Sequence, residues 1–193
     1  MHRYYGRFAH APSVPPFRCD GYLPGGAIRD EQGASRPLAE LPPFLRALLA
    51  TDGTVTKILE AYFWEPVAVD TLEQRIEQAQ APVPWIEVAA GDGCLVRDAR
   101  LRGVRSGCAF AEAFSLIRTE LIPDDFRRRL IDREIGIGAL IRDSGLESYR
   151  EVLDVGLDRA APGGESVFRT YRIFIDERPV ILITEYFPLA LYR

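Results

Sequence analysis

The sequence predicts an α+β fold built on a mainly antiparallel sheet. Two observations support this prediction. Apolar residues recur at helical spacing early in the chain, between residues 38 and 63, whereas alternation of apolar and polar residues dominates later segments. The later segments also follow one another through short turn sequences typical of hairpins. Because the short helices come first and consecutive hairpins follow, the strands are expected to pair antiparallel.

Composition limits the kinds of protein that this chain can be. Its 193 residues suit one domain, and a hydrophobic share of 47% is ordinary for a folded protein. No apolar stretch approaches the roughly 20 residues of a membrane helix, and the start lacks the apolar core of a signal peptide, so a cytoplasmic location is expected. The net charge of −4 argues against a nucleic-acid partner. Cys19, Cys94 and Cys108 lie far apart, which indicates reduced thiols.

Histidine usage narrows the possible chemistry. The chain has two histidines, His2 and His10, and both lie in the Pro-rich start. A Ser-His-Asp triad, a Cys-His pair and a histidine metal site are therefore not expected in the core. An enzyme of this sequence would depend on carboxylates, on tyrosines or on its own substrate for proton transfer. No metal is expected.

The chain divides into an arm and one domain. Residues 1–37 are rich in Pro, Gly and Arg and show no periodicity, which predicts an irregular arm. From residue 38 the pattern becomes regular, so a single domain is expected over residues 38–193. No internal repeat is present.

Two short helices open this domain. The apolar spacing in residues 38–50 predicts the first helix. Asp52 and Gly53 form a turn, and either Thr54 or Thr56 could cap the second helix.

Two of the later strands carry a charge on their apolar side. After a strand at residues 66–78, alternation over residues 94–103 places Arg97 in phase with the apolar residues. The same test over residues 180–187 places Glu185 on the apolar side. Burying one unpaired charge costs several kcal/mol, so this arrangement requires an explanation. A buried ion pair between the two residues is one alternative, and a polar pocket in an apolar cavity is the other.

The strand at residues 108–121 supplies a third charged candidate. Glu112 shares a face with Phe110, Phe114 and Leu116. If that face is covered by protein, Glu112 is expected to line a pocket; if the face is exposed, Glu112 is expected to lie in solvent.

Helix and turn signals fill the rest of the domain. Pro123 predicts the start of a helix. A turn with Gly136 and Gly138 leads into a short helix that is expected to end near Gly145. Three β-rich segments follow, with a hairpin tip at residues 176–179.

Several segments together resemble a known family. The segments TDGTVTKILEAYF, CLVRDARLRG, REIGIGALI and FRTYRIFIDERPVILITEYFP occur in the order and spacing of the chorismate pyruvate-lyase superfamily. The similarity is greatest to the bacterial and archaeal branch that includes the mycobacterial 4-hydroxybenzoate synthases. It covers residues 38–193, and the RTYR and ITE motifs near the end are its most specific part.

The resemblance implies a fold and a site. The family fold is an antiparallel sheet with helices packed on one side and helical flaps over an enclosed ligand. Arg97 is implied to bind a ring carboxylate and Glu185 to act on the ring as the second catalytic residue. Backbone amides at Val55 and Ile137 are implied to hold the ligand, and Thr184 is included among the substrate-binding residues because it precedes Glu185.

The sequence departs from the family pattern in one strand. Where relatives carry a polar or charged side chain, this chain has Phe114, with Glu112 two residues earlier. Both residues are therefore expected at the substrate-binding site.

The implied activity is conversion of chorismate to a hydroxybenzoate, most directly 4-hydroxybenzoate, and pyruvate. The product would feed quinone or secondary-metabolite synthesis. No cofactor is implied, because formation of the aromatic ring drives the reaction. The implied partners are chorismate and its aromatic acid product, with no nucleic acid and no membrane, and a homodimer is left open. A non-catalytic sensor domain for an aromatic acid, and a lyase acting on a related chorismate-derived acid, are the alternatives.

Overall fold

The central element is a six-stranded antiparallel sheet. The computed structural model describes residues 26–29, 33–132, 136–159 and 164–192. The sheet has the strand order β3-β4-β5-β8-β7-β6, and every neighbouring pair is antiparallel. Its strands are β3 (Val67–Gln78), β4 (Gly93–Gly103), β5 (Ala109–Ile117), β6 (Ser148–Asp158), β7 (Ser166–Ile175) and β8 (Arg178–Pro188). The predicted α+β class with an antiparallel sheet is confirmed.

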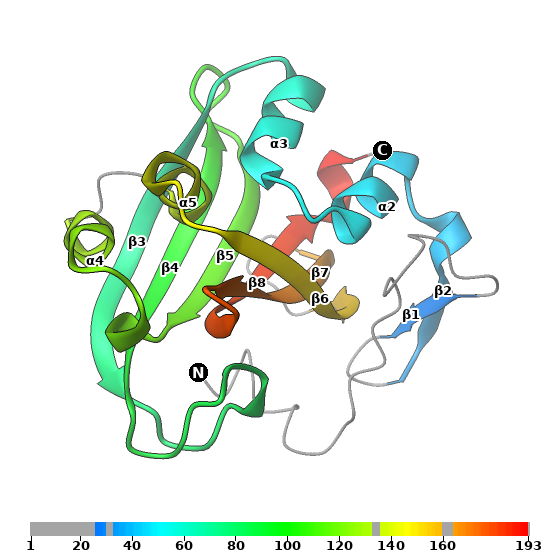
Figure 1. The fold of residues 1–193 in the computed structure, drawn as a ribbon. Helices are drawn as coiled ribbons and strands as arrows, with labels where there is room; N and C mark the ends of the chain where they lie inside the picture. Colours follow the sequence, from blue (N-terminus) through cyan, green and yellow to red (C-terminus); the bar gives the residue numbers. More distant parts are fainter. Residues whose placement is uncertain (1–25, 30–32, 133–135, 160–163, 193) are drawn as a thin grey trace.

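The α-helices of the described chain pack against one face of this sheet (Figure 1). They are α2 (Pro43–Ala50), α3 (Val55–Phe63), α4 (Asp124–Ile131) and α5 (Ile137–Ser144). Short 3-10 helices connect the larger elements: η2 (Leu38–Glu40), η3 (Pro84–Ile86), η4 (Thr119–Leu121) and η5 (Leu189–Leu191). In the described part of the chain, no helix is long and apolar enough to cross a membrane.

Local sequence signals account for the helix ends. Pro43 occupies the first turn of α2, where its missing N–H is not needed. Thr54 is the N-cap residue of α3, although its side chain makes no capping hydrogen bond. Pro123 precedes α4 directly, and Gly145 follows the last residue of α5 in the left-handed conformation, with φ of 63°. The predicted boundaries at Pro123 and Gly145 are confirmed.

Two apolar clusters lie on the helical face of the sheet. One joins α2 and α3 to β4, β5 and β8 through residues such as Leu48, Leu59 and Phe187. The other joins α4 and α5 to the sheet through Phe126 and Leu140. Arg97, Ser115 and Glu185 are buried on the same face, among these apolar residues. These three positions therefore form a polar strip inside an apolar layer.

The opposite face of the sheet is partly covered by protein and partly exposed to solvent. The segment between β3 and β4 packs Val83, Ile86 and Val88 against β5 and β8. Elsewhere on this face, cross-strand ion pairs join Arg100 to Glu112 and Arg102 to Asp70, at 3.1 and 2.6 Å.

The described part of the N-terminal arm is ordered. Strands β1 (Ala27–Arg29) and β2 (Ser35–Pro37) form an antiparallel pair, and Ile28 is buried in the core. Gly156 of β6 permits the close approach of β1, since a Cβ there would lie 3.0 Å from the Arg29 carbonyl oxygen. Within the arm that the sequence predicts to be irregular, these two strands are therefore short regular segments. Residues 1–25 and 30–32, with His2, His10 and Cys19, lie outside the described residues.

Candidate active site

A cavity of about 530 Å³ lies on the helical face of the sheet. This volume falls within the range usual for small-molecule sites. Five strands form its base and the starts of α3 and α5 form part of its wall, with the lining residues including Thr54, Thr56, Lys57, Glu60, Arg97, Ala99, Ala113, Ser115, Gly136, Ile137, Arg142, Tyr171, Ile183 and Glu185.

Arg97 brings a positive charge to the base of the cavity. Its side chain projects from β4 and the residue is 1% exposed. One Nη2 hydrogen bond is donated to the Oγ1 atom of Thr71 at 2.7 Å. Thr71 lies beside a bulge in β3, where the pairing with β4 shifts by one residue. The planar guanidinium has the geometry that suits two parallel hydrogen bonds to a carboxylate.

Glu185 brings a negative charge to the same cavity from β8. The residue is 5% exposed, and both of its oxygens accept hydrogen bonds. Arg169 donates from Nε to Oε2 at 2.8 Å, and Tyr171 donates from its hydroxyl to Oε1 at 3.2 Å. The buried ion pair of Glu185 is thus formed with Arg169, and the alternative of a direct pair with Arg97 is wrong.

The spacing of the two charges follows from the strand register. Arg97 pairs with Ser115, which pairs with Ile183, whereas Glu185 pairs with Ala113 in the next inward-facing row. Arg97 and Glu185 are therefore two strands apart and offset by two residues. With ordinary sheet spacings this places their Cα atoms roughly 12 Å apart. Because Ala113 and Ser115 are small, the space between the two charged side chains stays open.

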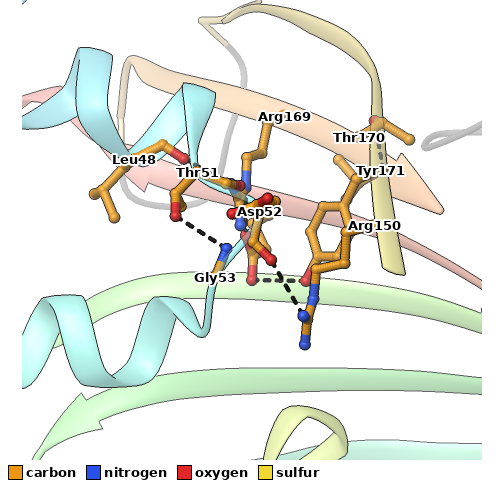
Figure 2. Close-up of polar contacts among 10 residues, drawn as sticks. Leu48, Thr51, Asp52, Gly53, Arg150, Arg169, Thr170 and Tyr171 are labelled. Atoms are coloured by element: carbon orange, nitrogen blue, oxygen red, sulfur yellow. Dashed lines mark hydrogen bonds and ion pairs between the residues drawn. The ribbon is translucent and has the colours of Figure 1, made fainter. Parts of the chain in front are cut away.

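Arg169 is a buried charge that the sequence analysis missed. It is 1% exposed, and besides Glu185 its Nη1 atom donates to the carbonyl oxygens of Leu48 and Thr51, at 2.7 and 2.6 Å (Figure 2). The alternation of residues in β7 could have identified it. Arg169 is in phase with the apolar residues Val167 and Ile173, just as Arg97 and Glu185 are in phase with the apolar residues of their own strands.

Two arginines anchor the turn that leads into α3. Arg169 of β7 binds the carbonyl oxygens at the end of α2, and Arg150 of β6 donates to the Asp52 carbonyl oxygen at 3.1 Å (Figure 2). The turn is further closed by a hydrogen bond from the Gly53 amide to the Thr51 hydroxyl at 3.0 Å. The start of α3 at the cavity is therefore fixed by side chains from the far strands of the sheet.

Tyr171 completes the polar group around Glu185. Burial raises the pKa of the Tyr171 hydroxyl well above its usual value, and the negative charge of Glu185 raises it further. The hydroxyl accordingly remains a proton donor to Glu185. The guanidinium of Arg169 lies over the Tyr171 ring, 4.7 Å from its centroid, which adds a cation–π contact.

The residues expected to supply backbone amides lie at the starts of two helices. Ile137, the first residue of α5, lines the cavity between Gly136 and Gly138. Val55, the first residue of α3, is buried in the core, and its neighbours Thr54 and Thr56 line the cavity. The first amides of a helix have no partner within the helix, so both segments present donors suited to an anionic ligand.

Three residues expected at the site lie on the other face of the sheet. Glu112 makes an ion pair with Arg100, and Phe114 packs in the cluster under the β3–β4 segment. Thr184 shares a hydrogen bond with Thr170, the two hydroxyls being 2.8 Å apart. Successive side chains of a strand alternate between faces, so these residues point away from the cavity that their neighbours line. None of the three is among the residues that line this cavity.

Comparison with solved structures defines the fold class. The effector domain of PhnF from Mycobacterium smegmatis superposes with a TM-score of 0.53 at 14% identity, covering 70% of this chain and 88% of that domain. A GntR-family transcriptional regulator from Bacillus cereus superposes with a TM-score of 0.51 at 11% identity, covering 66% of this chain and 94% of the regulator. The fold is that of the effector domains of such regulators.

Sequence comparison then identifies the family. Residues 49–193 match the family described as chorismate pyruvate-lyase Rv2949c-like. A chorismate pyruvate-lyase of Mycobacterium leprae is 32% identical over 159 residues, covering 77% of this chain and 76% of the relative. A putative lyase of Methanocaldococcus jannaschii is 28% identical over 152 residues, covering 74% and 76%. The chain belongs to the Rv2949c-like chorismate pyruvate-lyase family.

Proposed function

We propose that this protein converts chorismate to 4-hydroxybenzoate and pyruvate. The observation that carries the proposal is the pair of buried, oppositely charged side chains, Arg97 and Glu185, which face one cavity across the small residues of β5. Membership of the lyase family supports the same conclusion.

The cavity is suited to a ring with polar groups at opposite ends. In the proposed complex, Arg97 holds the ring carboxylate through two hydrogen bonds. The C4 hydroxyl, para to that carboxylate, donates to Glu185, whose other contacts with Arg169 and Tyr171 fix its position. The spacing of roughly 12 Å between the two Cα atoms leaves room for the ring between the two side chains. This arrangement favours the 4-hydroxy product.

The reaction itself is an elimination that balances without an added reactant. The bond between C3 and the ether oxygen breaks, and the hydrogen on C4 is lost as the ring becomes aromatic. The enolate of pyruvate leaves with the electron pair of the broken bond, and its methylene carbon takes up one proton, which balances the proton lost from C4. Glu185 orients the C4 end of the ring for this step, and positioning in a dry cavity lowers the barrier by holding the ring in the reactive geometry.

Pyruvate release from chorismate tests the proposal directly. The wild-type protein is incubated with chorismate, pyruvate is measured by a coupled assay, and the aromatic product is separated by chromatography. We expect 4-hydroxybenzoate and pyruvate in equal amounts. A protein that binds chorismate but forms no pyruvate would contradict the lyase proposal.

Substitution of Arg97 tests the assigned carboxylate contact. Arg97→Ala is expected to reduce kcat/KM by at least about a hundredfold, because a charge-assisted bidentate contact is lost. Arg97→Lys, the matched control, keeps the charge but not the planar fork, so it should recover only a small part of the activity. Circular dichroism and thermal unfolding confirm that each variant is folded. Full activity of Arg97→Ala would remove Arg97 from the proposed site, and full activity of Arg97→Lys would show that the planar fork is not required.

The fold also supports a second candidate. Effector domains of transcriptional regulators share this architecture, so a domain that binds an aromatic acid without turnover is the alternative. The same assay separates the two functions, because a sensor would bind the acid and release no pyruvate. Pyruvate release only from a related chorismate-derived acid would identify a lyase of different substrate.

A further inference from the structure

Lys57 is the only lysine in a sequence that has 23 arginines. It lies in the first turn of α3 and lines the cavity together with Thr56 and Glu60. Residues three and four apart share a helix face, so this face of α3 is turned to the cavity. Lys57 is exposed, whereas Arg97 is buried. The cavity therefore has one cation at its base and another at its mouth.

The other charges around the cavity are already engaged. Glu60 accepts a hydrogen bond from the Val67 amide at 3.1 Å, and Glu185 is paired with Arg169. Arg142 of α5 also lines the cavity, but it pairs with Asp143 at 2.9 Å. Within the described parts of the chain, Lys57 makes no ion pair. Its ammonium group is the cation at the mouth that is available to a ligand.

We infer that Lys57 binds the second carboxylate of a dicarboxylic substrate, the enolpyruvyl carboxylate of chorismate. This inference rests on the proposed function, since it takes the ring carboxylate to be held by Arg97. A second carboxylate that entered the cavity without a partner would lose hydration and gain no compensating contact. A lysine suits the exposed mouth, because its ammonium is a compact and mobile charge on a flexible stem.

The arrangement gives a physical basis for telling substrate from product. The substrate meets Arg97 at the base and Lys57 at the mouth. The aromatic product has one carboxylate and meets only Arg97. Lys57 thus strengthens binding of the dicarboxylate without strengthening retention of the monocarboxylate.

Steady-state kinetics and product binding test this difference. Lys57→Ala is expected to raise the KM for chorismate by about ten- to a hundredfold, the range for loss of a charge-assisted contact, with a smaller change in kcat. The Kd of 4-hydroxybenzoate, measured by calorimetry, should stay within about twofold. Lys57→Arg should recover part of the KM. Arg178→Ala is the matched control, because it removes one exposed charge at the β7–β8 turn, away from the cavity lining.

Chemical labelling gives a second readout that does not depend on turnover. An amine-directed reagent reacts with Lys57 and the N-terminal amine, and peptide mass spectrometry separates the two. Chorismate should protect Lys57, and 4-hydroxybenzoate at equal saturation should not. If chorismate protects Lys57 but no pyruvate forms, the inference stands and the proposed lyase activity fails.

Three results would overturn the inference. One is an unchanged chorismate KM, or an unchanged chorismate Kd, in Lys57→Ala. Another is an equal loss of affinity for chorismate and for 4-hydroxybenzoate. The third is a loss specific to chorismate in Arg142→Ala that is absent from Lys57→Ala, because that result would assign the second carboxylate to α5.

Discussion

At the scale of single residues, the site depends on which side of a strand each charge occupies. Alternation within β4 and β8 predicted that Arg97 and Glu185 face inward, and both line the cavity. The same rule could not decide which face of β5 lines the cavity. This strand lies inside the sheet and is buried on both faces, as the burial of both Phe114 and Ser115 shows. Thr184 directly precedes Glu185 and so faces the other way, which the alternation itself implies.

Arg169 is the residue whose removal is expected to affect both stability and catalysis. It pairs with Glu185 and holds two carbonyl oxygens at the end of α2. Arg169→Met should lower the free energy of unfolding by about 3–5 kcal/mol, because it leaves a buried carboxylate without its ion pair. Urea unfolding at constant pH measures this change.

A double-mutant cycle separates the ion pair from the packing of Arg169. Glu185→Gln alone and Arg169→Met alone each leave one partner unsatisfied, so the double variant should lose less stability than the sum of the two. Strict additivity would show that the pair contributes nothing to folding. Activity should be lost in all three variants, since each alters the group proposed to orient the ring.

At the scale of elements, proline and glycine residues predicted the ends of helices, but they could not predict the shortest strands. Pro123 and Gly145 marked helix boundaries, because their backbone restrictions act locally. Strands β1 and β2 have three residues each, too few for a period of two to be recognised. Strand β1 also contacts β6, which lies far along the chain, and local sequence does not encode such a contact.

The end of α5 offers a test of this local control. Gly145 has φ of 63°, and no atom lies within 4 Å of the position that a Cβ would take. Gly145→Ala should therefore reduce the free energy of unfolding by about 1 kcal/mol through backbone strain alone. Gly145→Asn, the matched control, should lose less, because asparagine tolerates this conformation better. Equal stability of Gly145→Ala and wild type in urea unfolding would contradict this account.

At the scale of the whole molecule, the site exists because β8 pairs with β5. The hairpins β4–β5 and β7–β8 join neighbours in sequence and follow from turn signals. The pairing of β5 with β8 brings together segments about seventy residues apart, so no local pattern predicts it. That pairing places Glu185 opposite Ala113 and thereby within reach of the ligand that Arg97 is proposed to bind.

Cys94, near the start of β4, provides a probe of opening of the structure around it. Burial raises the pKa of its thiol to about 11, with the nearby charges of Glu120 and Asp92 contributing less. Only the thiolate reacts rapidly with alkylating reagents, so Cys94 should be nearly inert in the folded protein at pH 8. Reaction should accelerate as pH rises toward about 11, and it should be fast at pH 8 in denaturant.

The raised pKa of Cys94 also determines how the stability of the fold changes with pH. The folded state holds the Cys94 proton more tightly than the unfolded state, whose thiol has a pKa near 9.0. Its contribution to stability is therefore complete below pH 9.0 and is lost as pH rises through about 11. A Cys94→Ala variant removes this contribution, and mass spectrometry of the alkylated peptide checks the reactivity. Rapid alkylation of native Cys94 at pH 8 would contradict the assigned burial.

The short side chains of β5 have a consequence for protein engineering. Ala113 and Ser115 occupy the base of the cavity between its two charged ends, in the middle of a rigid sheet. Adding one or two methyl groups there would shrink the chamber without disturbing either charge. A small library at these two positions should consequently yield variants that bind acids of different size, while the backbone of the sheet stays unaltered.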